Sequence, residues 1–271
     1  MRLNIDWKKT LLITLDVFIV AYLVMAVCSW HNPARKALAC TKVNINIADD
    51  EENGFLNPTE VKRLLETNGI YPLSKPIKDI NPRNIERRLV RMPFVNTAQC
   101  YVTKDGHVCI TITQRTPIVR VKSFNGDDYY VDDNGGVMPN SQYTSNMIIA
   151  TGAISRVYAC NYLATMTQCI MDDDLWRNEI EQINVLPDRT VELVPRVGDH
   201  IVNIGALPMA SDKNNRDNKV HEYVSNQLKR LEEFYKHGLS QAGWNKYSYI
   251  SLEYTNQIVC TKKDEYSHTQ Q

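Results

Sequence analysis

The stretch RMPFVNTAQCYVTKDGHVCITITQRTPIVRV, residues 91–121, decides the fold of the middle of this chain. Pro93 disfavours helical backbone at Met92, so a helix is predicted to end there. Two strand-forming runs, TAQCYV and HVCITIT, then flank Asp105 and Gly106, a pair that favours a tight hairpin turn. The stretch holds neither a nucleophile beside a base nor a complete set of metal ligands. The predicted hairpin therefore carries no catalytic chemistry of its own.

Two helix-start signals precede the hairpin. In NPTEVKRLLETNG, Asn57 is a favoured N-cap followed by a proline, and Gly69 suits the position after the last turn. In NPRNIERRLVRMPFV, Asn81 and its proline repeat the pattern. An alternating run, KVNINI, comes before both helices and predicts a strand. The order β-α-α-β-β over residues 41–121 predicts a three-stranded sheet with two helices on one face. The side chains expected at its core are Leu64, Leu89 and Ile110.

A larger β-rich domain with two or more helices is predicted over residues 122–263, which makes the fold class α+β. NMIIATG indicates a strand, and ISRVYACNYLATMTQCIM has helical spacing. DNKVHEYVSNQLKRLEEFYKHG is the clearest helix, and Gly238 is predicted to end it. YSYISLEYTNQIVCTKK indicates a last strand or strand pair, and residues 264–271 a flexible tail. The apolar face of the clear helix consists of Val220, Val224, Leu228, Leu231 and Tyr235.

The N-terminal region contains a long apolar segment. Residues 11–29 include one charge, Asp16, and would span about 28 Å as a helix, close to a bilayer core of about 30 Å. A signal peptide is the alternative, but no clear cleavage site follows the segment. We therefore predict a single transmembrane helix over residues 11–30, with a linker at 31–40. Residues assigned to the anchor are Leu11, Phe18 and Val27, with Trp7 and Trp30 at the two interfaces.

Charges beside this segment predict its orientation. Lys8 and Lys9 lie next to the apolar run, and short tails follow the positive-inside rule. Residues 1–10 are thus predicted to be cytoplasmic and the bulk of the chain to be outside, which in a bacterium is the periplasm. Asp16 reaches towards the near interface or contacts another transmembrane helix.

Composition excludes some classes of protein. The 271 residues include 31 Lys and Arg and 31 Asp and Glu, so the basic excess typical of nucleic-acid binders is absent. Seven cysteines cannot all pair with one another. Cys100 and Cys109 flank the hairpin turn, so a disulfide between them is possible, although free thiols are favoured.

Acidic residues form the best candidate for chemistry. Asp127, Asp128, Asp132 and Asp133 could serve metal binding or glycoside cleavage, but DDNGG is also typical of a solvated turn, which we favour. The histidines are scattered, without HxxxH or HExxH spacing, and no nucleophile elbow or phosphate-binding loop occurs. We therefore expect a non-enzymatic protein without a metal or other cofactor.

Five motifs follow one another along the chain: NIERRLVRMPFVNTAQC, ITITQRTPIVRV, YYVDDNGGVM, NMIIATG and YISLEYTNQIVC. Together and in this order they resemble the FtsQ/DivIB family of bacterial cell-division proteins, whose first module is a POTRA domain. The first motif is similar to the family's helix end. Gln114 stands where the family usually has Glu, and Glu253 stands where Arg is common.

The resemblance implies a membrane-anchored scaffold at the division septum of the bacterial inner membrane. It also implies partners of the FtsB (DivIC) and FtsL types, and through them an indirect link to the septal peptidoglycan synthase. Two alternatives remain open: a POTRA-bearing envelope chaperone or secretion-assembly module, and an anchored cell-wall enzyme that uses the acidic cluster.

The last strand is predicted to bind the partner. A final strand often lies at a sheet edge with unpaired backbone groups, to which another chain can add a strand. The resemblance points to the same strand, and Tyr254 falls on a family tyrosine. A purely structural role in finishing the core is the alternative. The predicted partner-binding residues are Tyr254, Asn256, Gln257, Ile258, Val259 and Cys260.

Overall fold

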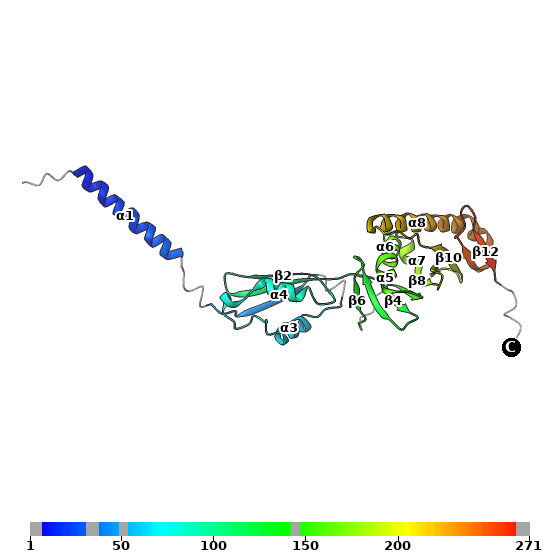
Figure 1. The fold of residues 1–271 in the computed structure, drawn as a ribbon, viewed down its shortest axis with the longest axis horizontal. Coiled ribbons are helices and arrows are strands. Elements are labelled where there is room, and N and C mark those ends of the chain that lie inside the picture. The colour runs from blue at the N-terminus through cyan, green and yellow to red at the C-terminus, as the bar shows by residue number, and fades with distance from the viewer. Residues whose placement is uncertain (1–6, 31–37, 49–53, 142–146, 264–271) are drawn as a thin grey trace, which may run out of the picture. The chain divides into compact units, whose positions relative to one another are not determined.

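Two compact units make up most of the protein in a computed structural model that describes residues 7–30, 38–48, 54–141 and 147–263 (Figure 1). The boundary between the units lies between Thr113 and Gln114. This corrects the predicted domain end at residue 121. The strand β4 (Pro117–Ser123) pairs with β5 (Asp128–Asp132) and β7 (Ile148–Gly152) of the second unit, so it belongs to the larger sheet.

Helix α1 (Trp7–Trp30) contains the apolar segment. Its described side chains, residues 11–26, are all exposed, Asp16 among them. Of the helices in the described parts of the chain, none is both long and apolar enough to cross a membrane. The side chains of Trp7, Val27 and Trp30 lie outside the described residues. The same is true of residues 1–6 and 31–37, from the predicted tail and linker, and of the predicted tail 264–271.

The N-terminal unit has the predicted β-α-α-β-β order. Its sheet has the strand order β1-β3-β2, and β1 runs parallel to β3. Both helices begin at the predicted caps: the Asn57 side chain accepts a hydrogen bond from the Thr59 amide (2.9 Å), and Asn81 accepts one from Asn84 (3.2 Å). The elements are β1 (Lys42–Ile47), α3 (Pro58–Thr67), η1 (Ile77–Asp79), α4 (Pro82–Leu89), β2 (Val95–Val102) and β3 (His107–Gln114).

The core of this unit lies between the helices and one face of the sheet. Leu89 and Ile110 are buried there as predicted, at 0% and 1% exposure. Leu64 is only half-buried; its neighbour Leu65 takes the central position with 0% exposure. The prediction therefore placed the core leucine in the correct turn of α3 but at Leu64 instead of the adjacent Leu65.

The hairpin cysteines lie on opposite faces of the sheet. Cys100 is buried in the core. Buried and half-buried residues alternate along β3, and Cys109 is one of the half-buried residues, which face away from the core. The Thr103 amide donates to the His107 carbonyl (2.8 Å), a register that places Tyr101 opposite Cys109. Both thiols are free, so the possible disulfide between them does not form.

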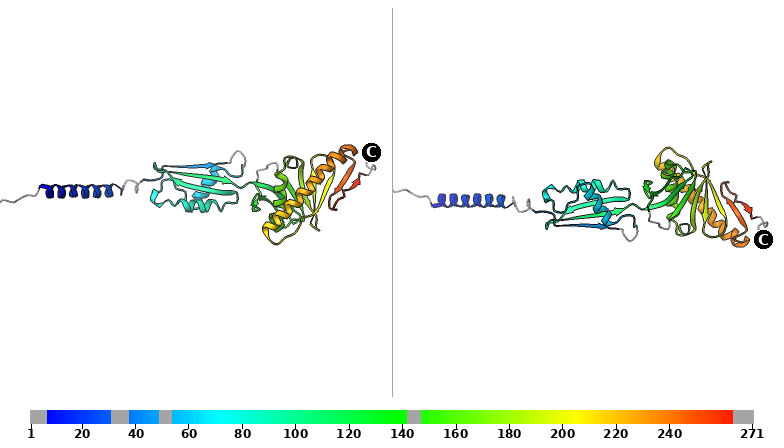
Figure 2. Two further views of the ribbon diagram at one scale, coloured as in Figure 1. Left: turned by 90° about the horizontal axis from the view of Figure 1, so that it is seen from above. Right: turned by 90° about the horizontal axis from the view of Figure 1, so that it is seen from below.

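The C-terminal unit is built on a nine-stranded sheet with the order β12-β11-β10-β9-β8-β7-β4-β5-β6. Helix α8 and the shorter helices cover one face of it (Figures 1 and 2). The remaining strands are β6 (Val137–Pro139), β8 (Ile180–Val185), β9 (Thr190–Pro195), β10 (Ile201–Ala206), β11 (Tyr247–Ser251) and β12 (Val259–Lys262). The helices are α5 (Arg156–Tyr158), the π-helix η2 (Ala159–Leu163), α6 (Ala164–Met171), α7 (Trp176–Glu179), α8 (Lys213–Phe234), the π-helix η3 (Tyr235–Leu239) and α9 (Ser240–Ala242).

Helix α8 buries the predicted apolar face from Val220 to Leu231, and Tyr235, the last residue of that face, is buried at the start of η3. Its predicted end at Gly238 is wrong. The chain passes through Gly238 within the short π-helix η3 and continues as α9. Gly243, with φ +98°, ends the helical run, because only there does the backbone enter the region that favours glycine.

Candidate partner-binding site

Strand β12 lies at one edge of the nine-stranded sheet, where β11 is its neighbour on one side. The Lys263 amide donates to the Lys246 carbonyl on the β11 side (3.1 Å). Successive backbone groups of a strand point to alternate sides. The N–H groups of Cys260 and Lys262 therefore point away from β11, towards the open edge.

The predicted binding segment is only partly strand. Val259 and Cys260 lie in β12, but Tyr254, Asn256, Gln257 and Ile258 lie in the connection from β11. The predicted strand pair is therefore present as β11 and β12, but the placement of these four residues in the last strand is wrong. Asn256 has φ +63°, a turn conformation that extended backbone does not allow. The connection is nevertheless accessible, since Tyr254 is 52% exposed, and Val259 in β12 is 46% exposed.

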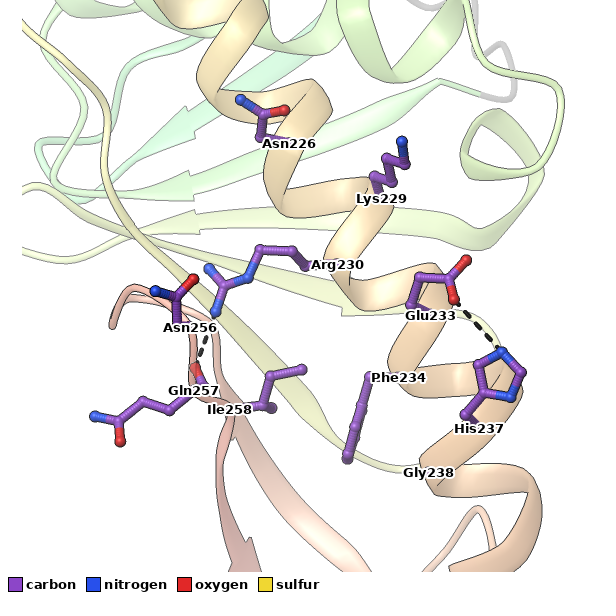
Figure 3. A pocket seen from close by; sticks show the side chains of 10 residues that line it. All are labelled: Asn226, Lys229, Arg230, Glu233, Phe234, His237, Gly238, Asn256, Gln257 and Ile258. Carbon is purple, nitrogen blue, oxygen red and sulfur yellow. Dashed lines mark hydrogen bonds and ion pairs between the residues drawn. The ribbon is translucent and has the colours of Figure 1, made fainter.

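A groove of about 690 Å³ runs between this connection and the C-terminal half of α8. Figure 3 shows Phe234 and Ile258 facing each other across it, one from the helix and one from the chain before β12. Glu233 and His237 form a 3.4 Å ion-pair contact along the helix side, provided that the imidazole is protonated. The groove thus combines an apolar centre with a charged rim, beside an edge strand.

Arg230 of α8 reaches across to the β11–β12 connection. Its guanidinium donates to the carbonyls of Leu252 (2.8 Å), Tyr254 (2.8 Å) and Gln257 (2.9 Å), and to the Gln227 side chain (2.7 Å). Sequence reasoning missed this residue. Its only signal in the sequence was an arginine beside the apolar face of a helix, where a solvated arginine is equally expected.

Gln227 and Tyr223, further back along α8, fix the neighbouring backbone. The buried Gln227 amide donates to the carbonyls of Ile204 (3.1 Å) and Leu252 (3.2 Å), and the Tyr223 hydroxyl also donates to Ile204 (2.5 Å). Glu253, in the connection after β11, accepts a hydrogen bond from the Asn203 side-chain amide (3.4 Å).

Polar and charged side chains meet near the start of β10 and the end of β12. His200 is 4% exposed, and its Nε2 lies 2.7 Å from the Tyr235 hydroxyl. Burial lowers the pKa of His200, and the nearby Lys263 ammonium lowers it further. The Lys263 ammonium also donates to Asp199 (2.6 Å) and thereby lowers the pKa of that carboxyl group.

Three of the four carboxylates of the acidic cluster each pair with a different arginine. Asp132 is 3% exposed, lies 2.6 Å from Arg115 Nε, and accepts hydrogen bonds from the amides of Asn134 (3.1 Å) and Gly136 (2.5 Å). It is a buried structural carboxylate, so the solvated-turn prediction is wrong for this residue.

The remaining carboxylates of the cluster have separate partners. Asp128 forms a bidentate ion pair with Arg120, whose Nε and Nη2 donate to the two carboxylate oxygens (2.9 and 2.7 Å). These hydrogen bonds lower the pKa of Asp128. Asp127 lies 3.4 Å from Arg156. The exposed Asp133 accepts from Asn134 Nδ2 (2.9 Å). No group of three or more His, Cys, Asp or Glu side chains could hold a metal ion in the described ranges.

Two models of known protein families match parts of this chain. A family model described as FtsQ/DivIB, C-terminal related, matches residues 116–261. The chain belongs to the FtsQ/DivIB family. A POTRA-like domain model matches residues 38–113 of this FtsQ/DivIB member, a range that holds the elements from β1 to α4 and β2, and most of β3. A search of curated proteins found no match.

Proposed function

We propose that this FtsQ/DivIB protein is a membrane-anchored, non-enzymatic scaffold of the bacterial division septum. Its partners are small division proteins of the FtsB (DivIC) and FtsL types, and through them it is linked to septal peptidoglycan synthesis. Family membership supports the division role, because family members are non-enzymatic division scaffolds.

The open edge of β12 is the observation that carries the partner proposal. The outward N–H groups of Cys260 and Lys262 match the requirements of strand addition, in which backbone hydrogen bonds supply affinity. The adjacent groove offers Phe234 and Ile258 to apolar side chains of the same partner. The predicted residues Tyr254, Asn256 and Gln257 line or border this surface, and Val259 and Cys260 belong to the edge strand.

The anchor proposal rests on α1. At about 1.5 Å per residue, a helix of 24 residues is about 36 Å long, a length comparable with a bilayer core of about 30 Å. Its exposed apolar side chains, Leu11 and Phe18 among them, are 65% and 76% accessible and suit a lipid environment. With Lys8 and Lys9 before the apolar run, we place the N-terminus in the cytoplasm and both compact units in the periplasm. In this arrangement Asp16 lies near the cytoplasmic end of the anchor.

Localisation in dividing cells tests the scaffold proposal. A fluorescent fusion of the full chain should gather at the septum and should retain an FtsB- or FtsL-type protein in a pull-down. Uniform envelope fluorescence without such a partner would favour the envelope chaperone or secretion module instead. A reporter that is active only in the cytoplasm, fused after Gln271, should stay inactive if the proposed topology is right.

A further inference from the structure

We infer that Arg230 is a positioning residue for the partner site: it holds the β11–β12 connection in the conformation that the partner recognises. The inference rests on the proposed function, since it concerns the same edge strand. Arg230 acts through the backbone that it binds, and the predicted binding residues Tyr254 and Gln257 are attached to that backbone.

The geometry of the connection calls for such a residue. The chain leaves β11 at Ser251 and enters β12 at Val259, so the carbonyl groups of the segment between them lie outside the β11–β12 ladder. Carbonyl groups in a turn of this kind need donors from elsewhere. Arg230 supplies donors to Leu252 at the start of the segment and to Tyr254 and Gln257 around its bend.

A planar guanidinium suits this task better than other side chains. Its N–H groups diverge in a fixed fork, so a single side chain can bind several carbonyls at once. Nη1 is shared between Leu252 and Gln227, while Nη2 is shared between Tyr254 and Gln257. The ammonium of a lysine at this position would be one compact donor centre and could not span the same carbonyls.

The packing of helix α8 fixes the position of the Arg230 guanidinium. Leu228 and Leu231, on either side of Arg230, are buried in the core of the C-terminal unit. Gln227, one turn earlier, is itself fixed by the Ile204 and Leu252 carbonyls. The position of the connection is therefore set by the packed helix, and Asn256 can keep its left-handed φ of +63° at the bend. The entry angle of β12, and with it the direction of its open N–H groups, follows from this arrangement.

Two variants of the full chain test the inference: Arg230→Gln and Arg230→Lys. The matched control is Lys219→Gln, which removes a positive charge from an exposed position on the same helix. Binding of the FtsB-type partner is measured by titration, and amide hydrogen exchange is followed across residues 252–262. We expect Arg230→Gln to weaken binding about tenfold or more and to speed exchange in the connection, because charged hydrogen bonds are lost. Arg230→Lys should lie between Arg230→Gln and the wild type, and Lys219→Gln should match the wild type.

Thermal unfolding separates positioning from general stability, since a positioning role leaves the melting temperature of the C-terminal unit nearly unchanged while affinity falls. Equal affinity of Arg230→Gln and wild type would overturn the inference, as would faster exchange spread over the whole sheet. If the wild type itself binds no such partner, the proposed function fails. The exchange measurement then still decides whether Arg230 holds the connection.

Discussion

Replacement of Leu89 by Ala should strongly destabilise the N-terminal unit. Leu89 is 0% exposed and packs in α4 against the sheet, so the truncation removes buried carbon atoms and leaves a cavity. Such changes cost about 2–5 kcal/mol. Leu64→Ala removes the same atoms from a half-buried site that solvent can partly fill, so we expect a loss of about 1 kcal/mol.

Urea unfolding can resolve this difference because of where the tryptophans lie. Of the four tryptophans, Trp176 and Trp244 are in the C-terminal unit, Trp7 and Trp30 are the first and last residues of α1, and residues 38–113 have none. The change in tryptophan fluorescence on urea unfolding of the compact units therefore reports the C-terminal unit, and circular dichroism reports both units. Leu89→Ala should shift a dichroism transition by about 1 M urea or more and leave the fluorescence transition in place. A loss below about 0.5 kcal/mol, or equal losses for Leu89→Ala and Leu64→Ala, would refute the core assignment.

Two further predictions concern charged groups of the C-terminal unit. Its stability should fall as the pH drops below about 6.5, because burial lowers the pKa of His200 and the unfolded chain then binds a proton that the folded chain does not. Urea titrations across this range should show a weaker pH dependence for His200→Gln; an unchanged dependence would assign the acid loss to other groups. Asp132→Ala should cost about 3 kcal/mol or more, because it leaves Arg115 and two amides without their carboxylate, whereas the exposed Asp133→Ala should cost less than about 0.5 kcal/mol. A wall-enzyme role predicts the opposite pattern, with wall hydrolysis lost and stability kept.

Local signals made much of the N-terminal unit predictable. Asn57 and Asn81 cap their helices through side-chain bonds to residues two or three positions away, and Gly106 takes φ +82° in the predicted turn. Each of these interactions is contained within a few residues, so the sequence pattern specifies it directly. The apolar face of α8 was predictable for the same reason.

Long-range pairing was not predictable in the same way. Strand β4 begins inside the range predicted for the first domain, residues 41–121, but its parallel pairing with β7 joins residues some thirty positions apart that share no local pattern. Arg230 likewise binds carbonyls 22 to 27 residues further along the chain. Gly238 was a plausible helix end by composition, but packing carries the helix through it, since Tyr235 and Leu239 on either side are buried.

The central claim is that the FtsB-type partner adds a strand to β12, and it is tested most directly by the partner's affinity for a variant in which the open edge of β12 is blocked. Lys262→Pro removes an outward N–H of β12 and is compared with Lys262→Ala, which removes the exposed side chain but keeps that N–H. The account predicts that Lys262→Pro, still folded by tryptophan fluorescence, weakens binding about tenfold or more, while Lys262→Ala binds nearly as the wild type does. Wild-type affinity for a folded Lys262→Pro protein would contradict strand addition at β12.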